Sequence, residues 1–216
     1  MTRTTELLPS GRLHLALHTL ASGEGRPLLL LHGLGEATPS ACPAWAAGWP
    51  GPVLGLDFTG HGESGVPVGG GYTPESLMAD VDAVLAGHGP LTIVGRGLGA
   101  WVALLVAGGR PRLVHGVVLA DGPGLAGGGH QPPSPYVTLL PTEPGRVPDP
   151  YALLELSHDV RPPDYALDFV RFAVEDSEVD NPIIVSARVR PDWLAVVAAD
   201  IGVLDLSLEE ALVAVA

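Results

Sequence analysis

The chain has 216 residues, and its hydrophobic content of 46% is typical of one globular domain rather than a disordered segment. Its 24 acidic residues outnumber the 11 basic residues, all of them arginine, and the net charge of −13 makes nucleic acid and anionic membranes poor partners. One cysteine, Cys42, excludes an internal disulfide. No apolar run is long enough for a membrane helix, and the N-terminal residues lack a signal-peptide core, so we expect a cytoplasmic protein.

Apolar runs and helical patterns alternate along the first 120 residues. Alternation at this spacing predicts βαβ units, and therefore an α/β fold with a mostly parallel sheet flanked by helices. Pro74 lies at a first-turn position that tolerates proline and marks the start of one helix. We expect strands at 13–20, 27–31, 52–58, 91–94 and 114–120, and helices at 74–85 and 98–107.

The second half of the chain is less regular. Residues 122 to about 150 are rich in glycine and proline, which predicts an irregular excursion over the top of the sheet. Within a single domain of residues 1–216, we regard 122–176 as a candidate lid or cap. The other expected elements are helices at 151–158, 163–175, 191–199 and 208–215, and a last strand at 182–187.

The segment that carries most information is Gly95-Arg96-Gly97-Leu98-Gly99. It follows a β-branched strand and precedes a helix, which is the layout of a G-x-S-x-G nucleophile elbow. Gly97 occupies the position of the serine, and glycine carries no hydroxyl. The segment therefore has the frame of a serine hydrolase site without its nucleophile.

Two further motifs precede the elbow in the expected order. Residues 28–35, Leu-Leu-Leu-Leu-His-Gly-Leu-Gly, resemble the strand and oxyanion loop of α/β-hydrolase-fold proteins, and residues 56–64 are similar to the D-x-x-G-x-G-x-S turn of that fold. Residues 72–80 resemble the helix that follows this turn. The resemblance covers about residues 10–122. It implies that Gly33 and the backbone amides of Leu34 and Leu98 form an oxyanion hole, next to the N-terminus of the helix at 98.

The departures from this family concern the catalytic triad. The family histidine lies in a loop after the last strand, whereas no histidine follows His158 in this chain. We therefore expect a truncated C-terminal part, in which a final strand and its loop are missing. Asp121, after the strand at 114–120, matches the position of the family acid in some members. Without a serine or a histidine it has nothing to orient.

Three residues near the predicted strand ends each allow two interpretations. Arg96 is either a ligand for a carboxylate or phosphate or a structural arginine. His61 is either a lone base or part of the turn, as is typical for this family. Asp121 is either a remaining acid or ligand contact, or a turn residue before Gly-Pro-Gly.

Other reactive side chains give weaker signals. Cys42 has no basic neighbour in the sequence and is more typical of a buried, inert thiol than of a nucleophile. His32 belongs to the oxyanion-loop motif. His130, His158 and Asp159 lack metal-ligand spacing, so we expect neither a metal nor a cofactor.

Three functional hypotheses remain. The first is a pseudoenzyme that binds a small, partly apolar ligand with a carbonyl or carboxylate group, or a protein partner. The second is an enzyme with unusual chemistry, a hydrolase, lyase or cyclase that uses His61, Asp121 or Arg96 with the oxyanion hole. The third is a protein-interaction subunit, in which the fold is only a scaffold. If the last strand is missing, either a homodimer or residues 151–175 would cover the exposed sheet edge. An open pocket lined by polar groups favours the first two, and a pocket filled by bulky side chains favours the third.

Overall fold

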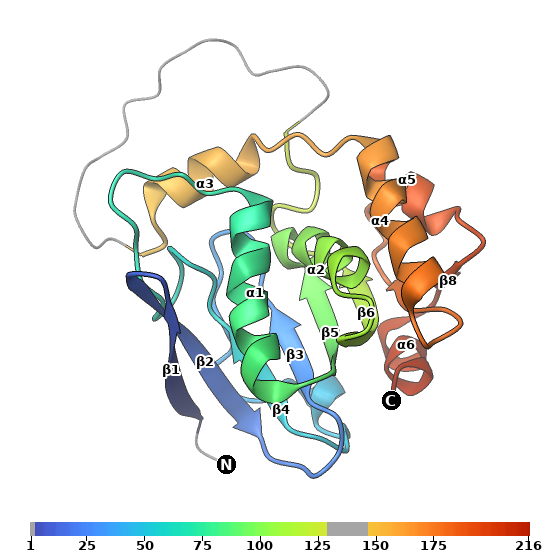
Figure 1. Ribbon diagram of the computed structural model, residues 1–216, viewed down its shortest axis with the longest axis horizontal. Coiled ribbons are helices and arrows are strands. Elements are labelled where there is room, and N and C mark those ends of the chain that lie inside the picture. The colour runs from blue at the N-terminus through green and yellow to red at the C-terminus, as the bar shows by residue number, and fades with distance from the viewer. Residues whose placement is uncertain (1–2, 129–146) are drawn as a thin grey trace.

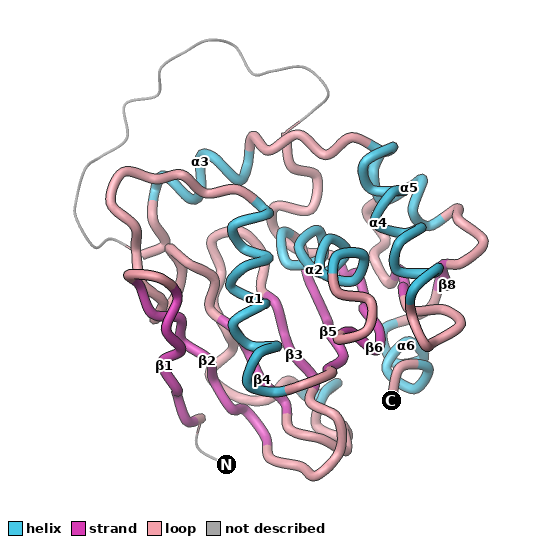
Figure 2. The backbone as a smooth tube through the Cα atoms, in the orientation of Figure 1, coloured by secondary structure: helices cyan, strands magenta, loops and turns pink. Residues whose placement is uncertain are grey.

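The computed structural model describes residues 3–128 and 147–216. Its centre is a sheet with the strand order β1-β2-β4-β3-β5-β6-β7-β8 (Figures 1 and 2). β2 pairs antiparallel with β1 and β4, and all other neighbouring strands are parallel. The predicted fold class, a mostly parallel sheet flanked by helices, is confirmed. The strands are β1 Thr4–Ser10, β2 Leu13–Ala21, β3 Leu28–Leu31, β4 Val53–Leu56, β5 Leu91–Arg96, β6 Val114–Ala120, β7 Ile183–Val185 and β8 Val203–Asp205.

The two ends of the sheet differ from the sequence-based expectation. β1 was not predicted, because its residues are largely exposed and show no apolar alternation. The strand predicted last, at 182–187, is β7, and β8 follows it and pairs with it. β8 was missed because it has only three residues, of which only Val203 is buried. The C-terminal part is therefore short, but it includes a further strand.

The helices divide unequally between the two faces of the sheet. Among the described residues, helices α1 to α5 contribute to the larger core on one face of the sheet, whereas α6 and a short 3-10 helix, η1, contribute to the smaller core on the other face. β3 shows the division: Leu29 and Leu31 face the larger core, and Leu28 and Leu30 face the smaller one. The helices are α1 Pro74–His88, α2 Leu98–Gly109, α3 Pro150–Ser157, α4 Pro163–Asp176, α5 Asp192–Ala198, α6 Leu208–Ala214 and η1 Ala44–Ala46.

Local sequence explains where several helices begin. α1 starts with a reciprocal capping box between Thr73 and Ser76, and Pro74 occupies its first turn. α6 starts with a capping box between Ser207 and Glu210. None of the helices in the described parts of the chain is long and apolar enough to cross a membrane.

The segment 122–176, predicted as a lid or cap, has several parts. Residues 129–146 lie outside the described residues. α3 lies beyond the carboxyl ends of the central strands (Figure 1), and α4 contributes Ala166, Val170 and Ala173 to the larger core. The idea of a lid itself stays a prediction.

Candidate functional site

The predicted elbow has the backbone shape of a sharp strand-to-helix turn. Gly97 lies between β5 and α2 with φ +60° and ψ −121°, a left-handed conformation that a residue with a side chain adopts only under strain. The turn is held by hydrogen bonds from the Gly97 amide to the Ala120 carbonyl (3.1 Å) and from the Gly99 amide to the His32 carbonyl (3.1 Å). The elbow therefore joins β5 to β6 and to the loop after β3.

The two amides that the resemblance assigns to an oxyanion hole lie close together. The N–H groups of Leu34 and Leu98 both donate to the carbonyl oxygen of Pro123, at N···O distances of 3.0 and 2.9 Å. Two donors converging on one oxygen is the geometry that an oxyanion hole requires. Here the oxygen belongs to the chain itself, so both donors are already satisfied.

The same segment occupies the space of the absent serine side chain. A Cβ atom built on Gly97 would collide with the Pro123 carbonyl oxygen and would stand 2.6 Å from the carbonyl carbon of Gly122. Both neighbours are backbone atoms, which cannot rotate away as a flexible side chain could. We call residues 122–125, which fill this space and contact the amides of Leu34 and Leu98, the plug.

Two buried side chains hold the plug from behind. Arg161, which is 3% exposed, donates from Nη1 to the carbonyls of Gly124 and Leu125, at 2.7 Å each. The indole Nε1 of Trp193 donates to the same Leu125 carbonyl at 2.8 Å. Neither contact is predicted by the sequence. An isolated arginine before two prolines gives no signal of such a role.

Asp121 lies at the carboxyl end of β6, as predicted, but its partners are distant in sequence. Its two carboxylate oxygens accept hydrogen bonds from the amides of Arg188 and Val189, at 2.9 Å each. These residues follow β7. Asp121 therefore holds the loop after β7 against the end of β6, rather than closing the local Gly-Pro-Gly turn.

His61 and His32 form a buried pair of neutral rings. The ring centroids are 5.1 Å apart; His61 is fully buried, and His32 is 4% exposed. His32 donates from Nδ1 to the Gly33 carbonyl and accepts at Nε2 from the Phe58 amide, and burial lowers the pKa of His32 to about 4. His61 contacts the Thr59 carbonyl through Nδ1, and burial lowers its pKa as well.

The family resemblance places an acid and a base in the loops after the last two strands. The penultimate strand, β7, is followed by Ser186 and Arg188, and the last strand, β8, is followed by Ser207. The Ser207 hydroxyl is used in the capping box of α6, where it accepts from the Glu210 amide and donates to the Glu210 carboxylate. The loop after β8 thus starts a helix instead of presenting a base.

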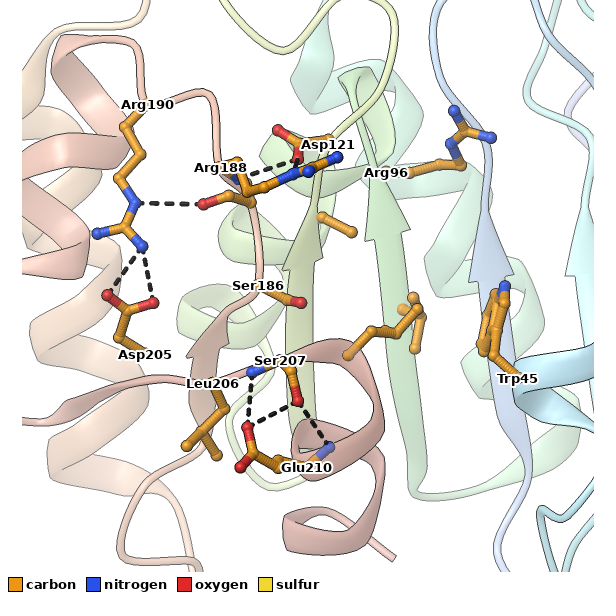
Figure 3. A pocket seen from close by; sticks show the side chains of 14 residues that line it. Trp45, Arg96, Asp121, Ser186, Arg188, Arg190, Asp205, Leu206, Ser207 and Glu210 are labelled. Atoms are coloured by element: carbon orange, nitrogen blue, oxygen red, sulfur yellow. Dashed lines mark hydrogen bonds and ion pairs between the residues drawn. The ribbon is translucent and has the colours of Figure 1, made fainter.

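An open cavity of about 800 Å³ lies at the carboxyl ends of β5 to β8, on the sheet face covered by η1 and α6. We call this cavity the hollow. Its walls include Arg96, Asp121, Ser186, Arg188 and Ser207 (Figure 3). A second cavity of about 420 Å³ adjoins it and shares Trp45, Val94 and Arg96.

Three arginines line the hollow, and they differ in how closely their guanidinium groups pair with carboxylates. Arg190 donates from Nη2 to both carboxylate oxygens of Asp205, at 2.7 and 2.8 Å. The Arg188 side chain is almost fully exposed and lies 3.9 Å from Asp121. Arg96 makes one ion pair of 3.4 Å, with Glu36. Arg96, predicted as a ligand contact, therefore lines the same cavity as two further arginines that follow β7.

No group of three or more metal-ligating side chains occurs among residues 3–128 and 147–216. His130 lies outside these ranges, and His158 is exposed and contacts the Leu154 carbonyl at the end of α3. Cys42 is partly buried, and burial raises the pKa of its thiol.

Comparison with known proteins finds relatives that match about half of the chain and a solved structure that matches most of it. It is 36% identical over 124 residues to 2-succinyl-6-hydroxy-2,4-cyclohexadiene-1-carboxylate synthase of Serratia proteamaculans (strain 568), covering 52% of this chain and 46% of that one. A thioesterase domain from the curacin biosynthetic pathway matches with a TM-score of 0.50 and 26% identity, over 56% of this chain and 44% of that one. The chain thus spans less than half the length of either relative.

A mutant of haloalkane dehalogenase DatA from Agrobacterium tumefaciens matches with a TM-score of 0.62 over 94% of this chain and 88% of its own. At 18% identity this likeness concerns the fold alone. The model of the alpha/beta hydrolase family matches residues 28–212, which is most of the chain. The chain belongs to the alpha/beta hydrolase family.

Proposed function

We propose that this chain is a non-hydrolytic alpha/beta hydrolase that binds a small, partly apolar carboxylate in the hollow. The observation that carries the proposal is the Pro123 carbonyl, which accepts hydrogen bonds from both Leu34 and Leu98. An occupied oxyanion hole does not stabilise a tetrahedral intermediate, and Gly97 supplies no nucleophile to form one. The site that hydrolysis needs is thus replaced by backbone.

The hollow has the size and lining that a small ligand needs. Binding sites of about 300–1,000 Å³ with mostly apolar walls and a few polar groups are typical for small molecules. Val94 and Leu206 contribute apolar wall here, and Trp45, which is partly exposed, offers an aromatic surface. Arg96 has donors left beside its one contact with Glu36, and a guanidinium binds a carboxylate with two parallel hydrogen bonds. The Serratia relative is named for making a carboxylate, which agrees with this ligand class.

The alternative of an enzyme with unusual chemistry has less support. His61 is fully buried, so it does not contact a molecule in the hollow. Both carboxylate oxygens of Asp121 accept backbone amides. Of the three residues considered for such chemistry, Arg96 and Asp121 line the hollow. Asp121 is already engaged by backbone amides, and an arginine does not act as a base at neutral pH.

Binding is tested by calorimetry with benzoate, phenylacetate and hexanoate, each compared with its neutral amide. We expect the carboxylates to bind and the amides to bind more weakly. Arg96→Gln should weaken carboxylate binding by about tenfold or more, because a charge-assisted hydrogen bond is lost. The matched variant Arg112→Gln removes an exposed arginine just before β6, at the end of that strand that lies away from the hollow. It should bind carboxylates as the wild type does. Equal binding by both variants would contradict the proposal.

Hydrolysis is tested separately with a panel of aryl esters and thioesters. We expect no turnover above buffer for the wild type. Leu98→Pro removes one of the two amides and serves as the control for any activity that is seen. Turnover in the wild type that disappears in Leu98→Pro would show a working oxyanion hole and would refute the non-hydrolytic assignment.

A further inference from the structure

The plug joins two parts of the molecule that are held in different ways. On its N-terminal side, Asp121 is fixed through its carboxylate to the loop after β7. On its C-terminal side, the Gly128 amide donates to the Asp159 carbonyl at 2.7 Å. Between these points the chain contains Gly124 and Gly127, both with left-handed φ values of +75° and +65°. Glycines at these positions allow the segment to change direction without side-chain strain.

Arg161 is the charged group that fixes the plug. Its guanidinium lies behind the plug, where Nη1 donates to two plug carbonyls and Nε lies 3.4 Å from the Asp159 carboxylate. The guanidinium carbon also lies 5.4 Å from the ring centroid of Trp101. A cation buried to this degree is stable only where enough acceptors surround it. The plug carbonyls of Gly124 and Leu125 supply most of them.

The surroundings of Arg161 leave it incompletely satisfied. Its Nη2 atom is buried and has no hydrogen-bond partner among the described residues. Burial lowers the pKa of Arg161 to about 10, although the contact with Asp159 opposes this effect. Arg161 and the plug carbonyls therefore depend on each other, because moving either one leaves a buried polar group without its partner.

We propose that the plug is a built-in occupant of the oxyanion hole that Arg161 holds in place. When the Arg161 guanidinium leaves the plug carbonyls, Pro123 withdraws, and the amides of Leu34 and Leu98 accept a carboxylate or carbonyl oxygen from outside. This places a second, concealed oxygen-binding site beside the hollow. It goes beyond the proposed function and does not depend on ligand binding at Arg96.

The plug contact is measured directly by NMR. In the wild type we expect scalar couplings across the hydrogen bonds from the Leu34 and Leu98 nitrogens to the Pro123 carbonyl carbon. In Arg161→Lys, which keeps the charge but loses the planar pair of contacts, hydrogen exchange at these two amides should be about tenfold faster than in the wild type. Amides in the middle of α2 should exchange at the wild-type rate. Arg171→Lys, which replaces an exposed arginine on α4, is the matched control. It should change hydrogen exchange neither at Leu34 and Leu98 nor in the middle of α2.

The concealed site is probed with acetate. We expect acetate to shift the Leu34 and Leu98 amide resonances of Arg161→Lys at concentrations that leave those of the wild type unchanged. Equal shifts in both proteins, or exchange that rises equally throughout α2, would overturn the proposal. Trp193→Phe removes the indole hydrogen bond to Leu125 together with part of a buried ring that packs against Trp101, and it provides a second variant should Arg161→Lys not fold. In Trp193→Phe the amides of Leu34 and Leu98 should also exchange faster than in the wild type, whereas amides in the middle of α2 should not. Unchanged exchange at Leu34 and Leu98 would refute the proposal.

Discussion

The Pro123 carbonyl group lies where a side chain at Gly97 would otherwise lie. The carbonyl oxygen of Pro123 reaches the paired amides of Leu34 and Leu98 only because Gly97 has no side chain in its path. A side chain at Gly97 would in turn have to displace the backbone of Gly122 and Pro123. The space where a side chain at position 97 would lie is therefore filled by the backbone of Gly122 and Pro123.

Gly97→Ser should therefore not create a hydrolase. We expect no ester turnover and a loss of about 2 kcal/mol or more in the free energy of unfolding, because the new side chain meets fixed backbone at a left-handed φ. Denaturant unfolding and an aryl ester assay measure both. Gly87→Ser in α1 is the matched control, since nothing lies within 4 Å of a Cβ there. It should change stability by no more than about 0.5 kcal/mol. Rapid ester turnover by Gly97→Ser would show that the plug moves aside easily.

Asp121→Ala should loosen the loop after β7. The substitution leaves the amides of Arg188 and Val189 without their acceptors, and we expect a loss of about 1–3 kcal/mol in the free energy of unfolding. Weaker carboxylate binding should accompany it, because Arg188 lines the hollow. Asp168→Ala removes an exposed carboxylate paired with Arg171 on α4 and should cost less than about 1 kcal/mol. Equal losses in the two variants would argue against a clamp at Asp121.

Asp57→Ala should be among the most destabilising changes in the chain. The buried Asp57 carboxylate accepts from the amides of Thr38 and Glu63 and contacts His18 Nε2 at 3.0 Å. Burial raises its pKa, but these hydrogen bonds outweigh burial and lower it overall. Removing the acceptor of these donors, of which those of Thr38 and His18 are buried, should cost about 3–5 kcal/mol, or prevent folding. Asp82→Ala, which removes an exposed ion pair with Arg110, is the comparison in denaturant unfolding.

His32 and Asp80 should give opposite pH dependences of stability. The folded pKa of His32 is about 4 against 6.5 in the unfolded chain, so its contribution to the free energy of unfolding falls by about 3 kcal/mol as pH decreases from 6.5 to 4. Burial raises the pKa of Asp80 to about 6 from 3.8, so its contribution increases as pH decreases through the same range. The two effects partly cancel in the wild type.

Denaturant unfolding between pH 4 and 7 separates these contributions. In the wild type, His32 makes the free energy of unfolding rise as pH increases from 4 to 6.5. In His32→Gln this rise should be lost, so the free energy of unfolding should increase less over this range than in the wild type. Asp80→Asn should make the loss of stability on acidification steeper. The same slope in both variants would contradict the assignment, and an NMR titration of the His32 ring checks its pKa directly.

Much of the frame could be predicted from the sequence. β3, β4, β5 and β6 are continuous apolar runs because parallel strands are buried on both faces, and such runs are visible without coordinates. The turn after β4, the elbow at Gly97 and the position of Asp121 follow from glycine and aspartate placed at strand ends. β1 and β8 were missed because exposed or very short strands show no hydrophobic period.

The chain by itself determined the family and the absence of a hydroxyl at Gly97, because both depend on local residue order. Only the tertiary structure decided what fills the space beside that glycine. Pro123 is 26 positions from Gly97 in the sequence, and Arg161 and Trp193 reach the plug from further still. Hydrogen bonds of this kind leave no period or motif in a sequence, because they depend on where the sheet and helices bring distant backbone together.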